Sequence, residues 1–96
     1  MIFQEYKDSL QNDAPPAGLN RALEALWQAG KGNWAASHDI TQAPGDPNVD
    51  WVHAWLHRQE GDLSNAGYWY RKAGKPVYEG ELQDEWDAIA EALLEE

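Results

Sequence analysis

Residues 61–76 read GDLSNAGYWYRKAGKP, and this stretch indicates the fold more clearly than any other part of the sequence. Its small and aromatic residues recur every three or four positions, which is the spacing of one helix face: Ala66, Trp69, Tyr70 and Ala73. Asp62 or Ser64 can cap the start of such a helix, and the Gly-Lys-Pro that closes the stretch ends it. The pattern predicts a helix over residues 64–73.

A second helical pattern precedes this stretch, over residues 48–60, and its apolar face consists of Trp51, Val52, Trp55 and Leu56. The two patterns predict a helical hairpin over residues 48–76. The same order of helix, Gly-Asn, helix and Pro occurs over residues 17–44, and the turn glycines, Gly32 and Gly61, are 29 positions apart. Because such a unit cannot bury its apolar face alone, we expect the two hairpins to stack.

The ends of the chain predict two further amphipathic helices. Residues 1–12 place Phe3, Tyr6 and Leu10 on one side, and residues 80–96 place Leu82, Trp86, Ile89 and Leu93 on one side. No stretch has the pattern of a strand. The sequence therefore predicts one all-α domain over residues 1–96, in which the end helices cover the outer faces of the hairpins.

The 61–76 stretch resembles the second half of a tetratricopeptide or Sel1-like repeat. Those families place a small residue, then an aromatic, then a small residue and then proline, at the spacing found here: Ala66, Tyr70, Ala73 and Pro76. The resemblance is best over residues 48–76, since residues 17–44 have Ser and Thr at the corresponding small and aromatic positions. The segment 53–74 also resembles small bacterial proteins of unknown function. The resemblance implies stacked helical hairpins that bind segments of other proteins.

Composition excludes several classes of site and partner. The 96 residues include no Cys, so disulfides, thiolate nucleophiles and Cys-ligated metals are excluded. The net charge of −10 argues against binding to nucleic acid or anionic lipid. The acidic residues are concentrated over residues 79–96, which predicts either a solvated helix face or a docking surface for a basic partner.

The sequence has neither an apolar run that could span a membrane nor the start of a signal peptide, so we expect a cytoplasmic protein. It is also rich in tryptophan, with six indoles. Five of these six lie on apolar stripes and are predicted to pack in the core.

Three histidines form the main candidate site. His53 and His57 are four positions apart on one predicted helix, the spacing that zinc ligands use, and His38 lies on the preceding helix. A zincin motif would need Glu directly after the first His, and position 54 is Ala. The first interpretation is that these histidines border the core and bind no metal or cofactor. The alternative is a site for a metal, a proton or a small ligand.

Tyr68 and Arg71 form a second candidate surface. Tyr68 lies away from the apolar face of its predicted helix, so we expect it to be exposed and able to contact a partner. Arg71 belongs to the one basic cluster, with Lys72 and Lys75. This cluster is predicted either to pair with the acidic last helix or to bind an anion or an acidic peptide.

No catalytic motif occurs, so no catalytic residue is assigned and an enzyme is the less favoured class. The predicted function is non-catalytic binding of a protein or peptide. One alternative is a metal-binding or small-ligand protein, or an enzyme, that uses His38, His53 and His57. Another is a homodimer in which a second copy supplies the missing repeat surface.

Overall fold

The computed structural model describes residues 1–43 and 45–95 and contains six α-helices and one 3-10 turn in that part of the chain. They are α1 (Phe3–Asp8), η1 (Ser9–Gln11), α2 (Arg21–Gly30), α3 (Trp34–Ile40), α4 (Pro47–Gln59), α5 (Leu63–Ala73) and α6 (Leu82–Leu94). No strand occurs among the described residues, so the predicted all-α class is confirmed. No helix there is long and apolar enough to cross a membrane. Residue 44 ends the predicted first hairpin and residue 96 ends the predicted last helix; both lie outside the described part.

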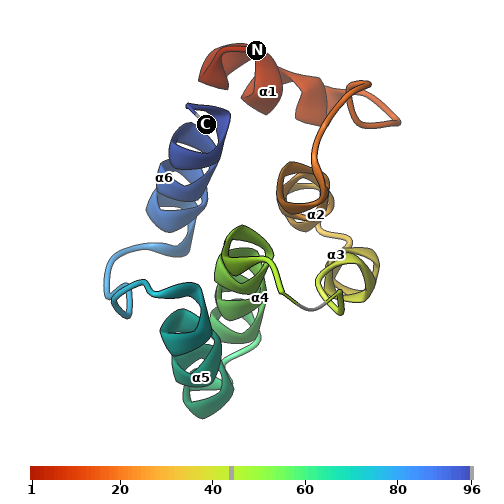
Figure 1. Cartoon of the computed structure of the whole chain (residues 1–96). Coiled ribbons are helices and arrows are strands. Elements are labelled where there is room, and N and C mark those ends of the chain that lie inside the picture. The colour runs from red at the N-terminus through yellow and green to blue at the C-terminus, as the bar shows by residue number, and fades with distance from the viewer. Residues whose placement is uncertain (44, 96) are drawn as a thin grey trace.

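Helix α4 lies at the centre of the molecule, between α5 and α6 on one side and α2 and α3 on the other (Figure 1). Its apolar residues Val49, Val52 and Leu56 are completely buried. They belong to one core cluster with Leu26 of α2 and Ile89 of α6. Burial of this apolar surface stabilises the fold by about 25 cal/mol per Å², so α4 is the helix around which the others are organised.

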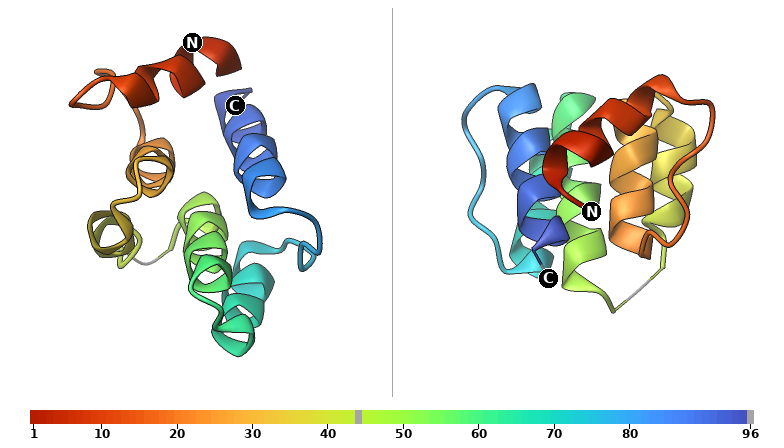
Figure 2. Two further views of the ribbon diagram at one scale, coloured as in Figure 1. Left: turned by 180° about the vertical axis from the view of Figure 1, so that it is seen from behind. Right: turned by 90° about the horizontal axis from the view of Figure 1, so that it is seen from above.

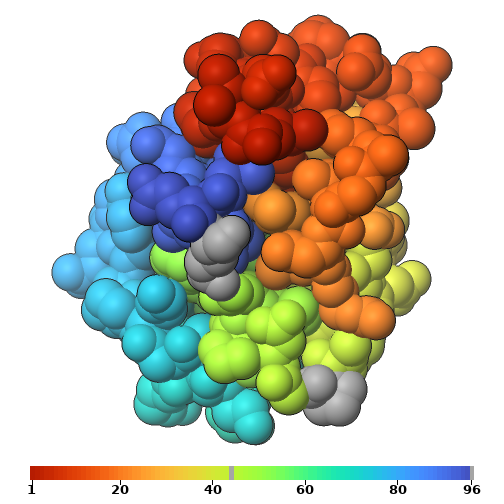
Figure 3. All heavy atoms as spheres, turned by 45° about the horizontal axis from the view of Figure 1, so that its top comes forward, coloured from red at the N-terminus to blue at the C-terminus, as the bar shows by residue number. Residues whose placement is uncertain are grey.

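Helix α1 lies obliquely across the other helices, as the right-hand view of Figure 2 shows. The hydroxyl of Tyr6 donates a hydrogen bond to the Leu23 carbonyl, and its ring stacks on Trp86 at a centroid distance of 5.7 Å. Figure 3 shows the N-terminal residues lying against the end of α6. The first helix therefore joins α2 and α6, as expected for an end helix that covers the core.

Two turns with the same hydrogen bonds connect α2 to α3 and α4 to α5. The Asn33 N–H donates to the Gln28 carbonyl at 2.9 Å, and the Asp62 N–H donates to the His57 carbonyl at 2.9 Å. Each turn contains a glycine in the left-handed region, with φ of 83° at Gly32 and 88° at Gly61. Because a Cβ is disfavoured at this φ, the backbone conformation explains why glycine occupies both turn positions of the predicted repeat.

Helix α5 approaches α4 closely through small residues. Ala54 of α4 and Ala66 of α5 form a second buried cluster with Tyr70, and Ala73 is also buried. The predicted small-aromatic-small face therefore contacts a neighbouring helix rather than solvent.

Several helix boundaries differ from the prediction. The first helix of the first hairpin begins at Arg21 rather than near residue 17, because the Asn20 side chain caps it by accepting from the Leu23 N–H at 2.9 Å. The last helix begins at Leu82 rather than at residue 80. The Gly80 carbonyl instead accepts a hydrogen bond from Arg58 of α4, which holds the preceding loop against that helix.

One prediction was that the basic cluster of Arg71, Lys72 and Lys75 pairs with the acidic last helix, but the described ion pairs of α6 involve other cations. In the described part of the chain, the partners of α6 are Lys7, which pairs with Asp87 at 3.2 Å, and Arg58, which pairs with Glu85 at 3.0 Å. The physical reason is that α6 packs mainly on α2 and α4, whereas the predicted cluster lies at the end of α5.

Candidate functional site

A polar stripe runs along the face of α4 between α3 and α5. Its residues recur every three or four positions, the spacing of one helix face, and continue into the following turn: Asp46, Asp50, His53, His57 and Glu60. Three of them are nearly buried, with exposed fractions of 6% for Asp50, 3% for His53 and 6% for His57. Because polar side chains are normally exposed, a buried polar stripe beside an apolar core is a candidate functional site.

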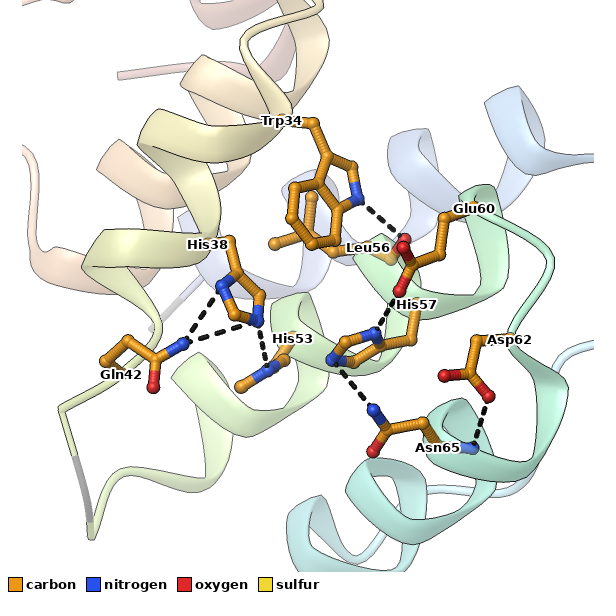
Figure 4. A network of polar contacts seen from close by, with 9 residues as sticks. All are labelled: Trp34, His38, Gln42, His53, Leu56, His57, Glu60, Asp62 and Asn65. Carbon is orange, nitrogen blue, oxygen red and sulfur yellow. Dashed lines mark hydrogen bonds and ion pairs between the residues drawn. The ribbon is translucent and has the colours of Figure 1, made fainter.

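The three histidines meet on this stripe (Figure 4). The Nε2 atoms of His53 and His38, from α4 and α3, lie 3.2 Å apart. The ring of His57 lies 4.8 Å from that of His53 and 5.4 Å from that of His38, between centroids. One ring nitrogen from each residue lies within 4.8 Å of the other two. The pairing of α3 with α4 thus brings all three sequence candidates into one cluster, with His38 at its half-buried edge.

Polar side chains around the cluster orient two of the rings. His57 Nδ1 donates to the Glu60 carboxylate at 2.6 Å, since an ionised carboxylate only accepts hydrogen bonds. In the neutral tautomer that has its proton on Nδ1, Nε2 carries a lone pair, and the Asn65 amide nitrogen lies 3.4 Å from it. The Gln42 amide nitrogen lies 2.9 Å from His38 Nδ1. Residues of α5 and of the turns that follow α3 and α4 thus fix the direction of these imidazoles.

Two indoles cover the cluster. Trp34 stacks on His38 at a centroid distance of 4.6 Å, and its Nε1–H donates to the Leu56 carbonyl at 2.9 Å. Trp69 stacks on His53 at 4.0 Å. These rings limit the access of water to two of the three imidazoles and hold them in place.

Burial keeps two of the imidazoles neutral at pH 7. Burial, together with the nearby His57 and His38, lowers the pKa of His53 to about 4, while the Thr41 backbone partly opposes the shift. Burial also lowers the pKa of His38. Among the described residues, no group lies in hydrogen-bond geometry with the buried Nδ1 of His53. Neutral imidazoles offer the lone pairs that a metal ion needs.

The other two sequence candidates lie outside the cluster, on α5. Tyr68 is 46% exposed, and its ring stands perpendicular to that of Trp69 at 5.0 Å. Arg71 is exposed at the last turn of the same helix. The structure therefore separates the His cluster from the surface formed by Tyr68 and Arg71.

Sequence reasoning missed some of the residues around the cluster. Gln42 follows His38 by four positions, so helical spacing was a usable signal for it. Asn65 and the stacked indole of Trp69 had no such signal, because their positions depend on how α5 packs against α4. Trp69 was predicted to pack in the core and is half-buried on the edge of the site.

Comparisons with protein families, curated proteins and solved structures found no family model, no curated protein and no solved structure that matches this chain. The resemblance to tetratricopeptide and Sel1-like repeats, and the protein-binding role that it implies, therefore stay predictions.

Proposed function

We propose that this protein binds a divalent transition-metal ion through His38, His53 and His57. The observation that carries this proposal is the 3.2 Å separation of the His38 and His53 Nε2 atoms. Two nitrogen ligands on a tetrahedral zinc ion, with bonds of about 2.0–2.1 Å, lie about 3.3–3.4 Å apart. The two imidazoles are therefore already at the spacing of two ligands of one ion.

The surroundings of His57 support it as the third ligand. Metal-bound histidines usually donate their second ring N–H to a carboxylate or carbonyl, which fixes the ring and raises the basicity of the ligating nitrogen. His57 Nδ1 donates to Glu60 in this way. The Nε2 lone pair of His57 then remains for the metal.

A small rearrangement at His38 makes its Nε2 a ligand. Between two neutral imidazoles, the short Nε2–Nε2 contact needs a proton on one of them. With the proton of each ring on its own Nδ1, both Nε2 atoms are free. The Gln42 amide, 2.9 Å from His38 Nδ1, can accept the proton of His38 through its oxygen after a half turn of the amide group.

The donor set favours Zn²⁺, Cu²⁺ or Ni²⁺ over Mg²⁺ or Ca²⁺, because imidazole suits the former ions and the latter prefer oxygen ligands. Three protein ligands leave a fourth position open on a tetrahedral ion. A water molecule or a small ligand would complete the coordination.

The test is calorimetric titration of Zn²⁺ into the metal-free protein at neutral pH. The variant His38→Gln removes a ligand at the half-buried edge of the cluster and is expected to weaken zinc binding about 100-fold or more. The matched control is Asp39→Asn, which changes an exposed charge on the next residue. It distinguishes coordination from the general attraction of a chain with a net charge of −10.

A thermal scan provides a second readout. At a free zinc concentration about 100 times the dissociation constant, binding stabilises the folded state by about 2.7 kcal/mol. For a domain of this size that raises the melting temperature by on the order of 10 °C, and a chelator reverses it. Absence of both heat and thermal shift, or equal zinc affinity in His38→Gln and the wild type, would refute the proposal.

A further inference from the structure

A small cavity of about 120 Å³ lies beside the His cluster, between the end of α3 and α5. Its lining includes Gln42, which contacts His38, and Trp69, which stacks on His53. Asp50, Tyr68 and Lys72 also line it. The cavity is thus adjacent to the proposed metal site but is formed mostly by other side chains.

The carboxylate of Asp50 has no hydrogen-bond or ion-pair partner among the described residues, although the residue is only 6% exposed. Its oxygens are not fully enclosed, since His53 Nδ1 is the one fully buried, unpaired side-chain atom among the described residues, so the carboxylate keeps some contact with solvent at the cavity wall. Burial and the neighbouring Asp46 both raise the pKa of Asp50. A nearly buried, unpaired acid in the wall of a cavity is the expected feature of a group that binds the positive end of a ligand.

Lys72 lines the same cavity. Its positive charge lowers the pKa of Asp50 and so partly offsets the effect of burial. The two groups nevertheless form no ion pair within 4.0 Å in the described part of the chain. The cavity therefore has an acid and a base in its lining that are near each other and not paired.

We propose that this cavity binds a small zwitterion, a short-chain amino acid, with its ammonium group at Asp50 and its carboxylate at Lys72. The side chains of Tyr68 and Trp69 supply apolar surface for the methylene groups of the ligand. An isolated cation would be repelled by Lys72, and an isolated anion by Asp50 and Asp46. Only a ligand that carries both charges is complementary to the cavity.

The volume limits the size of this ligand. The cavity has room for about four water molecules at ~30 Å³ each. This space matches glycine, alanine, β-alanine or γ-aminobutyrate, and because the cavity is partly open a larger side chain would have to extend outside it. The ligand does not need the metal ion, so this proposal is independent of the proposed function.

The experiment is a thermal-shift and calorimetric screen of these four amino acids on the metal-free protein. The single-charge controls are alkylamines and alkyl carboxylates of the same length. We expect at least one zwitterion to bind and to raise the melting temperature, while the matched amine and acid at the same concentration do not. No binding by any zwitterion, or equal binding by an amine or an acid alone, would overturn the proposal.

Two variants locate the site. Asp50→Asn and Lys72→Met should each weaken binding about ten-fold or more, because each removes a charged hydrogen-bond partner. Lys72 is exposed, so its variant is expected to fold even if the Asp50 variant does not. Lys75→Met is the matched control and should bind as the wild type does. Unchanged binding in Lys72→Met would overturn the assignment.

The variant His38→Gln separates this site from the metal site. It should lose zinc binding and keep binding of the amino acid. Loss of amino-acid binding in this variant, measured in the presence of a chelator, would contradict the independence of the two sites.

Discussion

His38 and His53 place their Nε2 atoms 3.2 Å apart although they come from different helices and are 15 positions apart in the sequence. The contact depends on the packing of α3 against α4, which no local sequence pattern specifies. His57 then adds a third imidazole from the same face of α4 as His53. This arrangement makes the protein's own indoles reporters of metal binding, because one stacks on His38 and another on His53.

Cu²⁺ binding should quench the fluorescence of Trp34 and Trp69, because both lie against proposed ligands and Cu²⁺ quenches nearby indoles. Replacing either with phenylalanine should remove a large part of the quenched signal. The matched control is Trp51→Phe, since Trp51 lies on α4 but stacks on none of the three imidazoles. Fluorescence titration of the four proteins measures this, and quenching that persists undiminished in both Trp34→Phe and Trp69→Phe would place the metal elsewhere.

Glu60→Ala should weaken zinc binding by about 10–100-fold, because it removes the carboxylate that orients His57. Glu60→Gln should restore part of that affinity, since an amide oxygen still accepts the Nδ1–H. The side chain of Glu60 is 40% exposed, so the change in folding stability should be small, about 0–1 kcal/mol. Calorimetry on both variants, with Glu24→Gln as an exposed control, measures this. Wild-type affinity in Glu60→Ala would show that the hydrogen bond from His57 to Glu60 does not support zinc binding.

The sequence predicts the helices of this fold better than their ends. Apolar residues at helical spacing identify the major helices, because that spacing reflects which side of each helix is buried. Their first and last residues depend on caps and loop contacts instead. The Asn20 side chain caps α2, which therefore starts later than predicted. The contact of Arg58 with the Gly80 carbonyl accompanies a later start of α6.

The candidate site is predictable only where its residues share one helix. The i, i+4 spacing of His53 and His57 places them on one face, and this face is a property of the sequence. The approach of His38, the stacking of Trp69 and the contact of Asn65 with His57 all depend on how α3 and α5 pack on α4. They become visible only when the helices are placed in space.

Gly32→Ala and Gly61→Ala should each destabilise the protein by about 1–2 kcal/mol. The two glycines have φ of 83° and 88°, where a Cβ is disfavoured. The matched control is Gly67→Ala within α5, where an added Cβ would meet only the end of the Arg71 side chain, at 3.5 Å. It should stabilise by up to about 1 kcal/mol, since alanine favours helix more than glycine does. Urea denaturation measures all three. A cost at only one of the turns would indicate that the two turns of the repeat are not equivalent.

Glu85→Gln should change how the free energy of unfolding depends on pH. The direction of that change shows whether burial or the ion pair with Arg58 dominates the pKa of Glu85. Glu85 is 1% exposed, accepts from Tyr70 and pairs with Arg58. Burial raises its pKa above the ordinary value of 4.5, and this effect outweighs the opposite effects of the Tyr70 hydroxyl and the Arg58 charge. A raised carboxyl pKa means that the folded state holds this proton more tightly than the unfolded chain does.

The contribution of Glu85 to stability is then complete below pH 4.5 and is lost as the pH rises through the folded-state pKa. Because glutamine does not titrate, the free energy of unfolding of the wild type minus that of Glu85→Gln should fall as the pH rises from about 4 to 7. One proton limits the slope to about 1.4 kcal/mol per pH unit. Urea denaturation over this range measures the difference. A difference that rises with pH would mean that the Arg58 ion pair, rather than burial, dominates the ionisation of Glu85.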